Sequence, residues 1–185
     1  MLLDNHVIRD SARPTRGLFW FRHDLRFHDQ VVLSSLCQQV DELTLLFIID
    51  DSWFVPNSYG IQPVGEHRFN FLIDTIEALN EKASALGHSI LTLKGQTPEL
   101  LVSLLSSNAY THIGVTEHGG YNERREVEAV SRFFPNIEIV TGESSSLFNQ
   151  NDLPFNLEVM PDVFTPFKRK IESAIKPCEP VATLT

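Results

Sequence analysis

Five short apolar runs, separated by segments of helical periodicity, restrict the fold of this chain more than any other feature of its sequence. The strongest runs are residues 18–21 and 43–49, and weaker ones follow at 89–93, 112–115 and 137–140. Their residues are almost continuously apolar and do not alternate with polar ones, which is typical of parallel strands covered on both faces.

Helical patterns occupy the intervals between these runs. Between Phe69 and Leu86 apolar residues recur with a period of 3.6 and stop before Gly87, which predicts a long helix with a glycine C-cap. Thr97-Pro98-Glu99 predicts another helix with Thr97 as its N-cap, and residues 31–37 and 122–133 predict two more. Strands that alternate with helices imply right-handed crossovers. We therefore expect a three-layer αβα domain of the α/β class, with a doubly wound, five-stranded parallel sheet of Rossmann-like type.

Composition divides the chain into three parts. Residues 1–16 lack the continuous apolar segment of a secretory signal, and we expect a flexible N-terminal tail there. The strand and helix patterns fill residues 17–141. Residues 142–185 are more polar and contain a last helical pattern over 163–175, so we expect a surface strap, a linker helix and a flexible C-terminus.

The charge is acidic and unevenly distributed. Fifteen basic residues face 24 acidic ones, for a net charge of −9, and residues 27–167 alone carry a net charge of −13. Such a body repels phosphate backbones, so we expect no direct DNA binding by this chain. No apolar run approaches the roughly 20 residues that span a bilayer. With only Cys37 and Cys178 there is no disulfide framework, and we expect a soluble, cytoplasmic protein without membrane contact.

Generic catalytic motifs are absent from the sequence. It contains no glycine-rich phosphate loop, no HExxH, no CxxC and no G-x-S-x-G, and we assign no catalytic residue. Among the seven histidines the closest pairs are His23/His28 and His112/His118, neither with the i, i+4 spacing of helical metal ligands. Local spacing therefore predicts no metal site.

A first polar cluster, residues 22–29, follows the first predicted strand at the carboxyl edge of the sheet. Ligands of open α/β sheets bind at this edge, so Arg22 and Asp24 are candidate binding residues. The alternative is an ion-pair network of Arg22, Asp24, Arg26 and Asp29 that holds the loop, and charge patterns of this kind favour that interpretation.

A second polar cluster, residues 117–125, follows the fourth predicted strand on the same edge. The amide of Asn122 and the carboxylate of Glu123 could hold a flat heterocycle by its N–H edge. Equally, Asn122 could be an N-cap and Glu123 an acid of the first helical turn. Spacing leaves both interpretations open.

Several ordered motifs resemble one family. Residues 19–29 (FWFRHDLRFHD) resemble the WFR-x-DLR-x-x-D signature of DNA photolyases and cryptochromes, and residues 65–72 (GEHRFNFL) resemble the start of that family's long second helix. Asn122-Glu123-Arg124 is similar to the family's N-E-R motif. Residues 160–172 (MPDVFTPFKRKIE) resemble a pattern of the cryptochrome-DASH branch, and the resemblance spans about residues 17–176.

The resemblance implies an antenna domain that binds methenyltetrahydrofolate or a deazaflavin. It implies that Asn122 and Glu123 contact the pterin ring, with Trp53 as a neighbour in the loop after the second strand. In the family, FAD and the photochemistry of DNA repair belong to a separate C-terminal helical domain. We therefore expect this chain alone not to be catalytic, and expect a flavin-binding helical domain as its partner.

The resemblance also implies a role for the last helical pattern, which leads toward the helical domain in the family. Its apolar stripe of Phe164, Phe167 and Ile171 should fold back on the sheet or stay exposed, where it would promote self-association. Two alternative functions remain at this point. One is a pigment-free α/β interaction or regulatory module, and the other is a nucleotide-binding domain using the same sheet edge.

Overall fold

A computed structural model describes residues 14–182 of the chain. Its centre is a sheet of five parallel strands in the order β3-β2-β1-β4-β5. The strands are β1 (Arg16–Phe21), β2 (Glu42–Asp50), β3 (Ile90–Gly95), β4 (His112–Thr116) and β5 (Glu138–Gly142). This architecture confirms the predicted doubly wound α/β fold.

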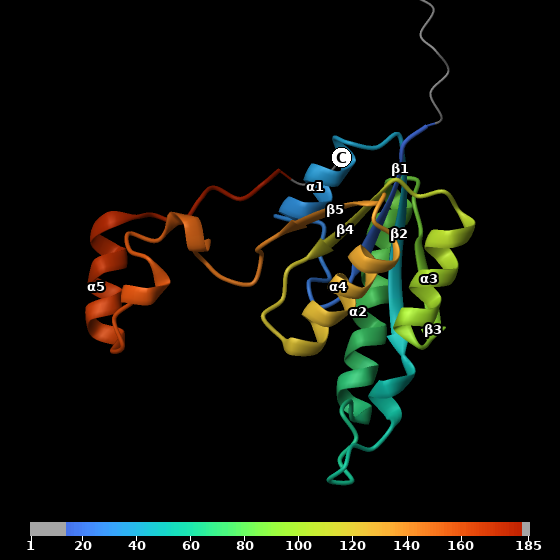
Figure 1. The fold of residues 1–185 in the computed structure, drawn as a ribbon, viewed down its shortest axis with the longest axis horizontal. Helices are drawn as coiled ribbons and strands as arrows, with labels where there is room; N and C mark the ends of the chain where they lie inside the picture. The colour runs from blue at the N-terminus through green and yellow to red at the C-terminus, as the bar shows by residue number, and fades with distance from the viewer. Residues whose placement is uncertain (1–13, 183–185) are drawn as a thin grey trace, which may run out of the picture.

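Four helices cover the two faces of the sheet, and a fifth lies away from it (Figure 1). The helices are α1 (Val31–Cys37), α2 (Glu66–Ala85), α3 (Thr97–Ser107), α4 (Tyr121–Phe133) and α5 (Phe164–Ala174), with 3-10 turns η1 (Asp51–Phe54), η2 (Gln150–Asp152) and η3 (Leu157–Val159). The helices α1 and α2 contribute to one hydrophobic cluster, whereas α3 and α4 contribute to the other.

The central strand β1 divides its side chains between the two clusters. Phe19 and Phe21 pack with α1 and α2, whereas Leu18 and Trp20 pack with α3 and α4. Successive side chains of a strand point to opposite faces, so one continuously apolar run fills two cores. All four residues are buried. Because both faces of the strand are buried, every residue from 18 to 21 has to be apolar, which explains the continuous apolar run in the sequence.

Helix ends differ in part from the sequence predictions. Gly87 follows α2 at a φ of 79°, and the bond from His88 N to Ala83 O closes a Schellman motif, so a glycine does end this helix. The N-cap of α3 is Gln96, and Thr97 lies inside the first turn with its N–H bonded to Asp50 Oδ2 at 2.9 Å. The prediction of Thr97 as N-cap is wrong because the helix begins one residue earlier, where Gln96 O accepts the hydrogen bond from Leu100 N.

The segment after β5 forms a small unit with α5, apart from the sheet (Figure 1). The rings of Phe155 and Phe167 pack edge to face with centroids 5.8 Å apart. Ile171 is buried and Phe164 is exposed. The stripe on α5 therefore neither folds onto the sheet nor stays wholly exposed, because the preceding strap covers part of it.

The ends of the described chain are tied to the α/β body. Thr15, within the predicted tail, donates its backbone N–H to Asp41 Oδ2 at 2.8 Å, and β1 already begins at Arg16. Residues 1–13 of that tail lie outside the described residues. Near the other end, the Val181 N–H donates to Asp29 Oδ1 at 2.9 Å. Among residues 14–182, no helix has the length and apolar character needed to cross a bilayer.

Candidate functional site

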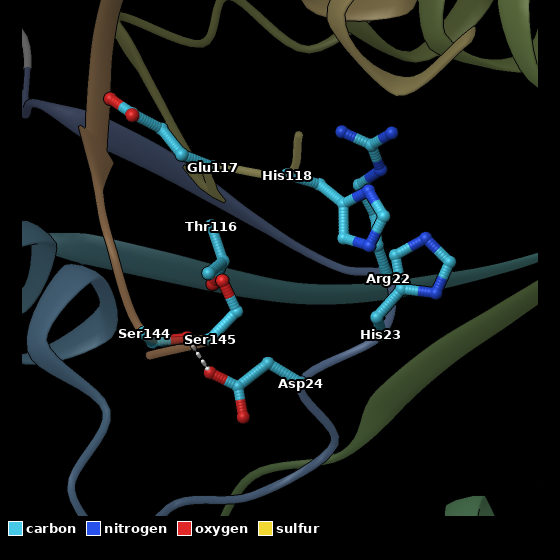
Figure 2. A pocket seen from close by; sticks show the side chains of 8 residues that line it. All are labelled: Arg22, His23, Asp24, Thr116, Glu117, His118, Ser144 and Ser145. Atoms are coloured by element: carbon cyan, nitrogen blue, oxygen red, sulfur yellow. Dashed lines mark hydrogen bonds between the residues drawn. The ribbon is translucent and has the colours of Figure 1, made fainter. Parts of the chain in front are cut away.

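A pocket of about 180 Å³ lies at the carboxyl edge of the sheet, outside the ends of β1 and β4 (Figure 2). Its lining comes from the carboxyl end of β4 and the segments that follow β1, β4 and β5, and consists of Arg22, His23, Asp24, Thr116, Glu117, His118, Ser144 and Ser145. In the observed strand order, β1 and β4 are neighbours whose connections run in opposite directions along the sheet. The pocket is therefore at the topological switch point, where doubly wound folds bind ligands.

Asp24 joins the loop after β1 to the segment after β5. Its Oδ2 accepts a hydrogen bond from Gln30 Nε2 at 3.0 Å and another from the Ser144 hydroxyl, as Figure 2 shows for Ser144. Its Oδ1 lies 3.0 Å from Arg26 Nε. The carboxylate thus has a structural role in holding one wall of the pocket, in addition to lining it.

Arg22 connects the same loop to α4. Its Nη2 lies 3.1 Å from Glu126 Oε2, and its guanidinium stacks on Trp20 at 4.8 Å from the ring centroid. Burial lowers the pKa of Arg22, while Glu126 opposes that change. Burial also raises the pKa of Glu126, against the effect of Arg22. The predicted ion-pair network in the loop is therefore only partly present, because Arg22 pairs with a helix and not within the loop.

Glu123 lies in the first turn of α4, which begins after Gly120 as N-cap. Asn122 is consequently the second residue of the helix, and its interpretation as an N-cap is wrong. The Glu123 carboxylate folds back over Gly120, where any side chain would collide with it. The hydrogen bond from its own backbone N–H lowers the pKa of Glu123, burial opposes this, and His118 and His23 lower the pKa further. Glu123 therefore does act as a first-turn acid.

Two histidines beside Glu123 were not selected from the sequence. His23 Nε2 lies 3.2 Å from Glu123 Oε1, and the rings of His23 and His118 are 4.3 Å apart between centroids. Figure 2 shows both rings facing each other at the rim of the pocket. Burial, His118 and Arg22 lower the pKa of His23 more than Glu123 raises it. Local spacing could not find this pair, because only the β1–β4 pairing brings two distant loops together.

The remaining predicted site residues lie outside the pocket lining. Asn122 is exposed at the start of α4. Trp53 lies in η1, where its ring packs against the core that contains Phe47, with centroids 6.3 Å apart. The structure thus brings Arg22, Asp24 and the neighbourhood of Glu123 together, and places Trp53 in the hydrophobic layer under α2.

Asp50 at the end of β2 provides a pH-dependent contact at the same edge. Burial would raise its pKa, but hydrogen bonds from Ser52 and Thr97 outweigh burial and lower it below the ordinary value of 3.8. A lowered folded-state pKa stabilises the fold above the unfolded-state pKa, and this contribution is lost as the pH falls through the folded value. We expect Asp50→Asn to cost stability near neutral pH and the difference from wild type to shrink below about pH 4.

Urea unfolding between pH 7 and pH 3 measures this difference. The control is Asp74→Asn, at an exposed position of α2, which should change stability by no more than about 0.5 kcal/mol at neutral pH. A wild-type advantage over Asp50→Asn that stays constant across this pH range would contradict the expectation.

Comparisons with known proteins agree with the geometry. The family model described as DNA photolyase matches residues 17–184. Cryptochrome DASH of Idiomarina loihiensis is 31% identical over 84% of this chain and 35% of its own length, and that of Synechocystis sp. is 30% identical over 89% and 35%.

Solved structures give the same result. The crystal structure of Synechocystis sp. PCC6803 cryptochrome has a TM-score of 0.81 at 26% identity, over 90% of this chain and 36% of that one. An archaeal photolyase from Sulfolobus tokodaii, solved with two FAD molecules and described as implying a novel light-harvesting cofactor, shares the fold with a TM-score of 0.74 at 20% identity, over 90% of this chain and 36% of that one. The chain thus spans about a third of the length of its curated relatives, corresponding to their N-terminal part, and it belongs to the DNA photolyase family.

Proposed function

We propose that this domain binds an antenna pigment, methenyltetrahydrofolate or a deazaflavin, at the carboxyl edge of β1 and β4. The pigment would pass absorbed light energy to a flavin in a helical domain, either of the same protein or of a separate chain. The observation that carries the proposal is the pocket at the switch point, which is flanked by Glu123 in a domain of the photolyase family. The light-harvesting cofactor implied for the Sulfolobus photolyase belongs to the same functional class.

Glu123 has the chemistry to hold a pterin. A carboxylate can accept two parallel hydrogen bonds from the amino group and ring N–H of a pterin, as it does from a guanidinium. The position at the start of α4 keeps this carboxylate ionised. Oε1 of Glu123 contacts His23, so the pigment would replace that contact. The neighbouring amide of Asn122 is exposed and available to the same ligand.

The size of the pocket supports a shared cage. Its volume of about 180 Å³ is below the roughly 300–1,000 Å³ of typical small-molecule sites. A pigment held here would therefore project beyond this domain and would need a second wall. The flavin-binding helical domain would supply that wall and receive the energy, so we expect weak retention by the isolated domain.

Replacing Glu123 by alanine tests the placement of the pterin. The purified chain is equilibrated with methenyltetrahydrofolate by dialysis, and the excess folate retained on the protein side is measured by near-ultraviolet absorbance. We expect Glu123→Ala to abolish retention, because the two acceptors for the pterin edge are lost. The melting temperature should change by no more than a few degrees, since partly exposed substitutions of this kind usually cost about 0.5 kcal/mol or less.

The matched control is Glu128→Ala, which removes an exposed carboxylate from the same helix and should leave retention unchanged. Retention that is equal in wild type and Glu123→Ala would refute the role of Glu123. If the wild-type chain retains neither folate nor deazaflavin, the binding proposal itself fails for the isolated domain.

A pigment-free interaction module is the second candidate function. It is favoured by the small pocket volume and by Asp24, whose carboxylate is occupied by Gln30 and Ser144 within the protein. If this candidate is correct, the protein should retain no near-ultraviolet or blue absorbance after incubation with either pigment, even when a flavin-binding helical domain is added. The same measurement therefore separates the two functions.

A further inference from the structure

Three potential metal ligands converge at the rim of the pocket from separate parts of the chain. His23 comes from the loop after β1, His118 from the loop after β4 and Glu123 from the first turn of α4. One donor atom from each lies within 4.8 Å of the others. The parallel pairing of β1 with β4 fixes the two loops side by side, so this proximity follows from the sheet itself.

The donor distances suit a tetrahedral ion. With bonds of about 2.1 Å to nitrogen and oxygen, neighbouring donors around zinc are about 3.4 Å apart. His23 Nε2 lies 3.2 Å and His118 Nδ1 lies 3.8 Å from Glu123 Oε1. Only a small inward movement of the side chains would bring the three donors to bonding distance from one ion.

The surroundings leave the three donors accessible to an ion. His118 Nδ1 accepts a hydrogen bond from the Gly120 N–H at 3.1 Å, and a bound ion would take the place of that donor. All three side chains are partly accessible, so an ion can enter and keep a water ligand. Arg22, whose charge acts on His23, is already paired with Glu126.

We propose that His23, His118 and Glu123 form a binding site for a divalent transition-metal ion such as Zn²⁺ or Co²⁺. Two imidazole nitrogens and one carboxylate favour such ions over Mg²⁺ and Ca²⁺, which prefer oxygen ligands. Three protein ligands leave a fourth position for water, as in open zinc sites. The acidic body of the domain, with a net charge of −13 over residues 27–167, raises the local concentration of cations.

The metal site shares Glu123 with the proposed pigment site but depends on different neighbours. A bound ion would occupy the carboxylate that the pterin needs, so the two ligands should compete. The nitrogens of His23 and His118 are proposed ligands of the ion, whereas Asn122 takes no part in the metal site and is a proposed contact of the pigment alone. Substitutions at these positions therefore distinguish failure of one proposal from failure of the other.

Cobalt titration tests the metal site. Chelator-treated protein is titrated with Co²⁺ and followed by visible absorbance, where a tetrahedral or five-coordinate ion gives stronger bands than hexaaqua cobalt. We expect saturation at one equivalent and bleaching by added Zn²⁺. His23→Ala and His118→Ala should each weaken binding by about tenfold or more, since even loss of a residue that only supports a ligand costs about 10–100-fold.

The control is the double variant His67→Ala/His88→Ala, which removes two exposed histidines elsewhere and should bind Co²⁺ like wild type. Circular dichroism checks that every variant is folded. Asn122→Ala, at an exposed position outside the pocket lining, should weaken folate retention and leave the Co²⁺ affinity unchanged, so it separates failure of the pigment proposal from failure of the metal site. Equal Co²⁺ affinity in wild type and His118→Ala, or visible bands no stronger than those of free cobalt, would overturn the site.

Discussion

Replacement of Phe19 by alanine is expected to lower the free energy of unfolding by about 3–5 kcal/mol. Phe19 lies on the central strand with 1% of its surface exposed, and its ring contacts that of Phe21 edge to face at 4.7 Å. The contact with the neighbouring strand β4 is also close, because a Cβ on Gly114 would lie 2.9 Å from the Phe19 ring. Removing the ring leaves a cavity that this close-packed layer cannot refill.

Urea unfolding followed by circular dichroism measures this loss. The matched control is Phe71→Ala on α2, where the ring is 68% exposed and a change of about 0.5 kcal/mol or less is expected. Similar losses for the two variants would show that the core under α1 and α2 is not packed as described.

Replacement of Arg22 by alanine is expected to lower the free energy of unfolding by about 2 kcal/mol. Removing one partner of a fully buried ion pair costs about 3–5 kcal/mol, and exposure of the other partner reduces this figure. The Arg22 side chain is 7% exposed and that of Glu126 is 31% exposed, so the lower value applies. Loss of Arg22 also removes the contact with the Trp20 ring.

The loss of stability in Arg22→Ala should depend on pH in a defined direction. Burial already raises the pKa of Glu126, and without Arg22 the opposing influence disappears. The unpaired carboxylate then disfavours the folded state above its folded pKa, and protonation relieves this penalty as the pH falls. The deficit of Arg22→Ala should therefore be larger at pH 7 than at pH 4.

A double variant separates the ion pair from simple loss of packing. Arg22→Met/Glu126→Gln removes both charges, and it should be more stable at pH 7 than Arg22→Met, which has the same side chain at position 22 but leaves the Glu126 carboxylate unpaired. Equal stabilities of these two variants, or a deficit independent of pH, would show that the pair does not hold α4 to the loop after β1.

The two ligand proposals have a common consequence for light harvesting. Both use the carboxylate of Glu123, which currently contacts His23. If both are correct, a transition-metal ion would lower pigment occupancy, and a chelator would restore it. Antenna function in this protein would then be sensitive to the metal supply, through side chains that its sheet topology places together.

The fold class and the location of the pocket could be predicted from the sequence. Continuous apolar runs such as residues 18–21 need cover on both faces, and parallel order follows from the helices between them. Polar residues immediately after the first and fourth runs had to lie on one edge, because parallel strands end on the same side. Arg22 and Asp24 line the pocket at that edge, and their role in binding a ligand stays a prediction.

The predictions from sequence were wrong where a polar group pairs with a residue far away along the chain. The sequence predicts Thr97 as the N-cap of α3, but Thr97 lies in the first turn and its N–H is accepted by Asp50, 47 residues earlier. The sequence allows Arg22 to pair within its own loop, but its partner in the structure is Glu126 of α4. In both cases the nearest partner in space belongs to another element, and short-range patterns contain no information about it.

The sequence by itself determined the class of fold, the edge of the sheet that carries polar chemistry and the family resemblance, because these depend on hydrophobic periodicity and ordered motifs. Only the tertiary structure decided which side chains meet there. The pairing of β1 with β4 brings His23 within reach of His118 and Glu123. Such contacts depend on strand order and on the direction of each side chain. The spacing of residues along the chain specifies neither of them.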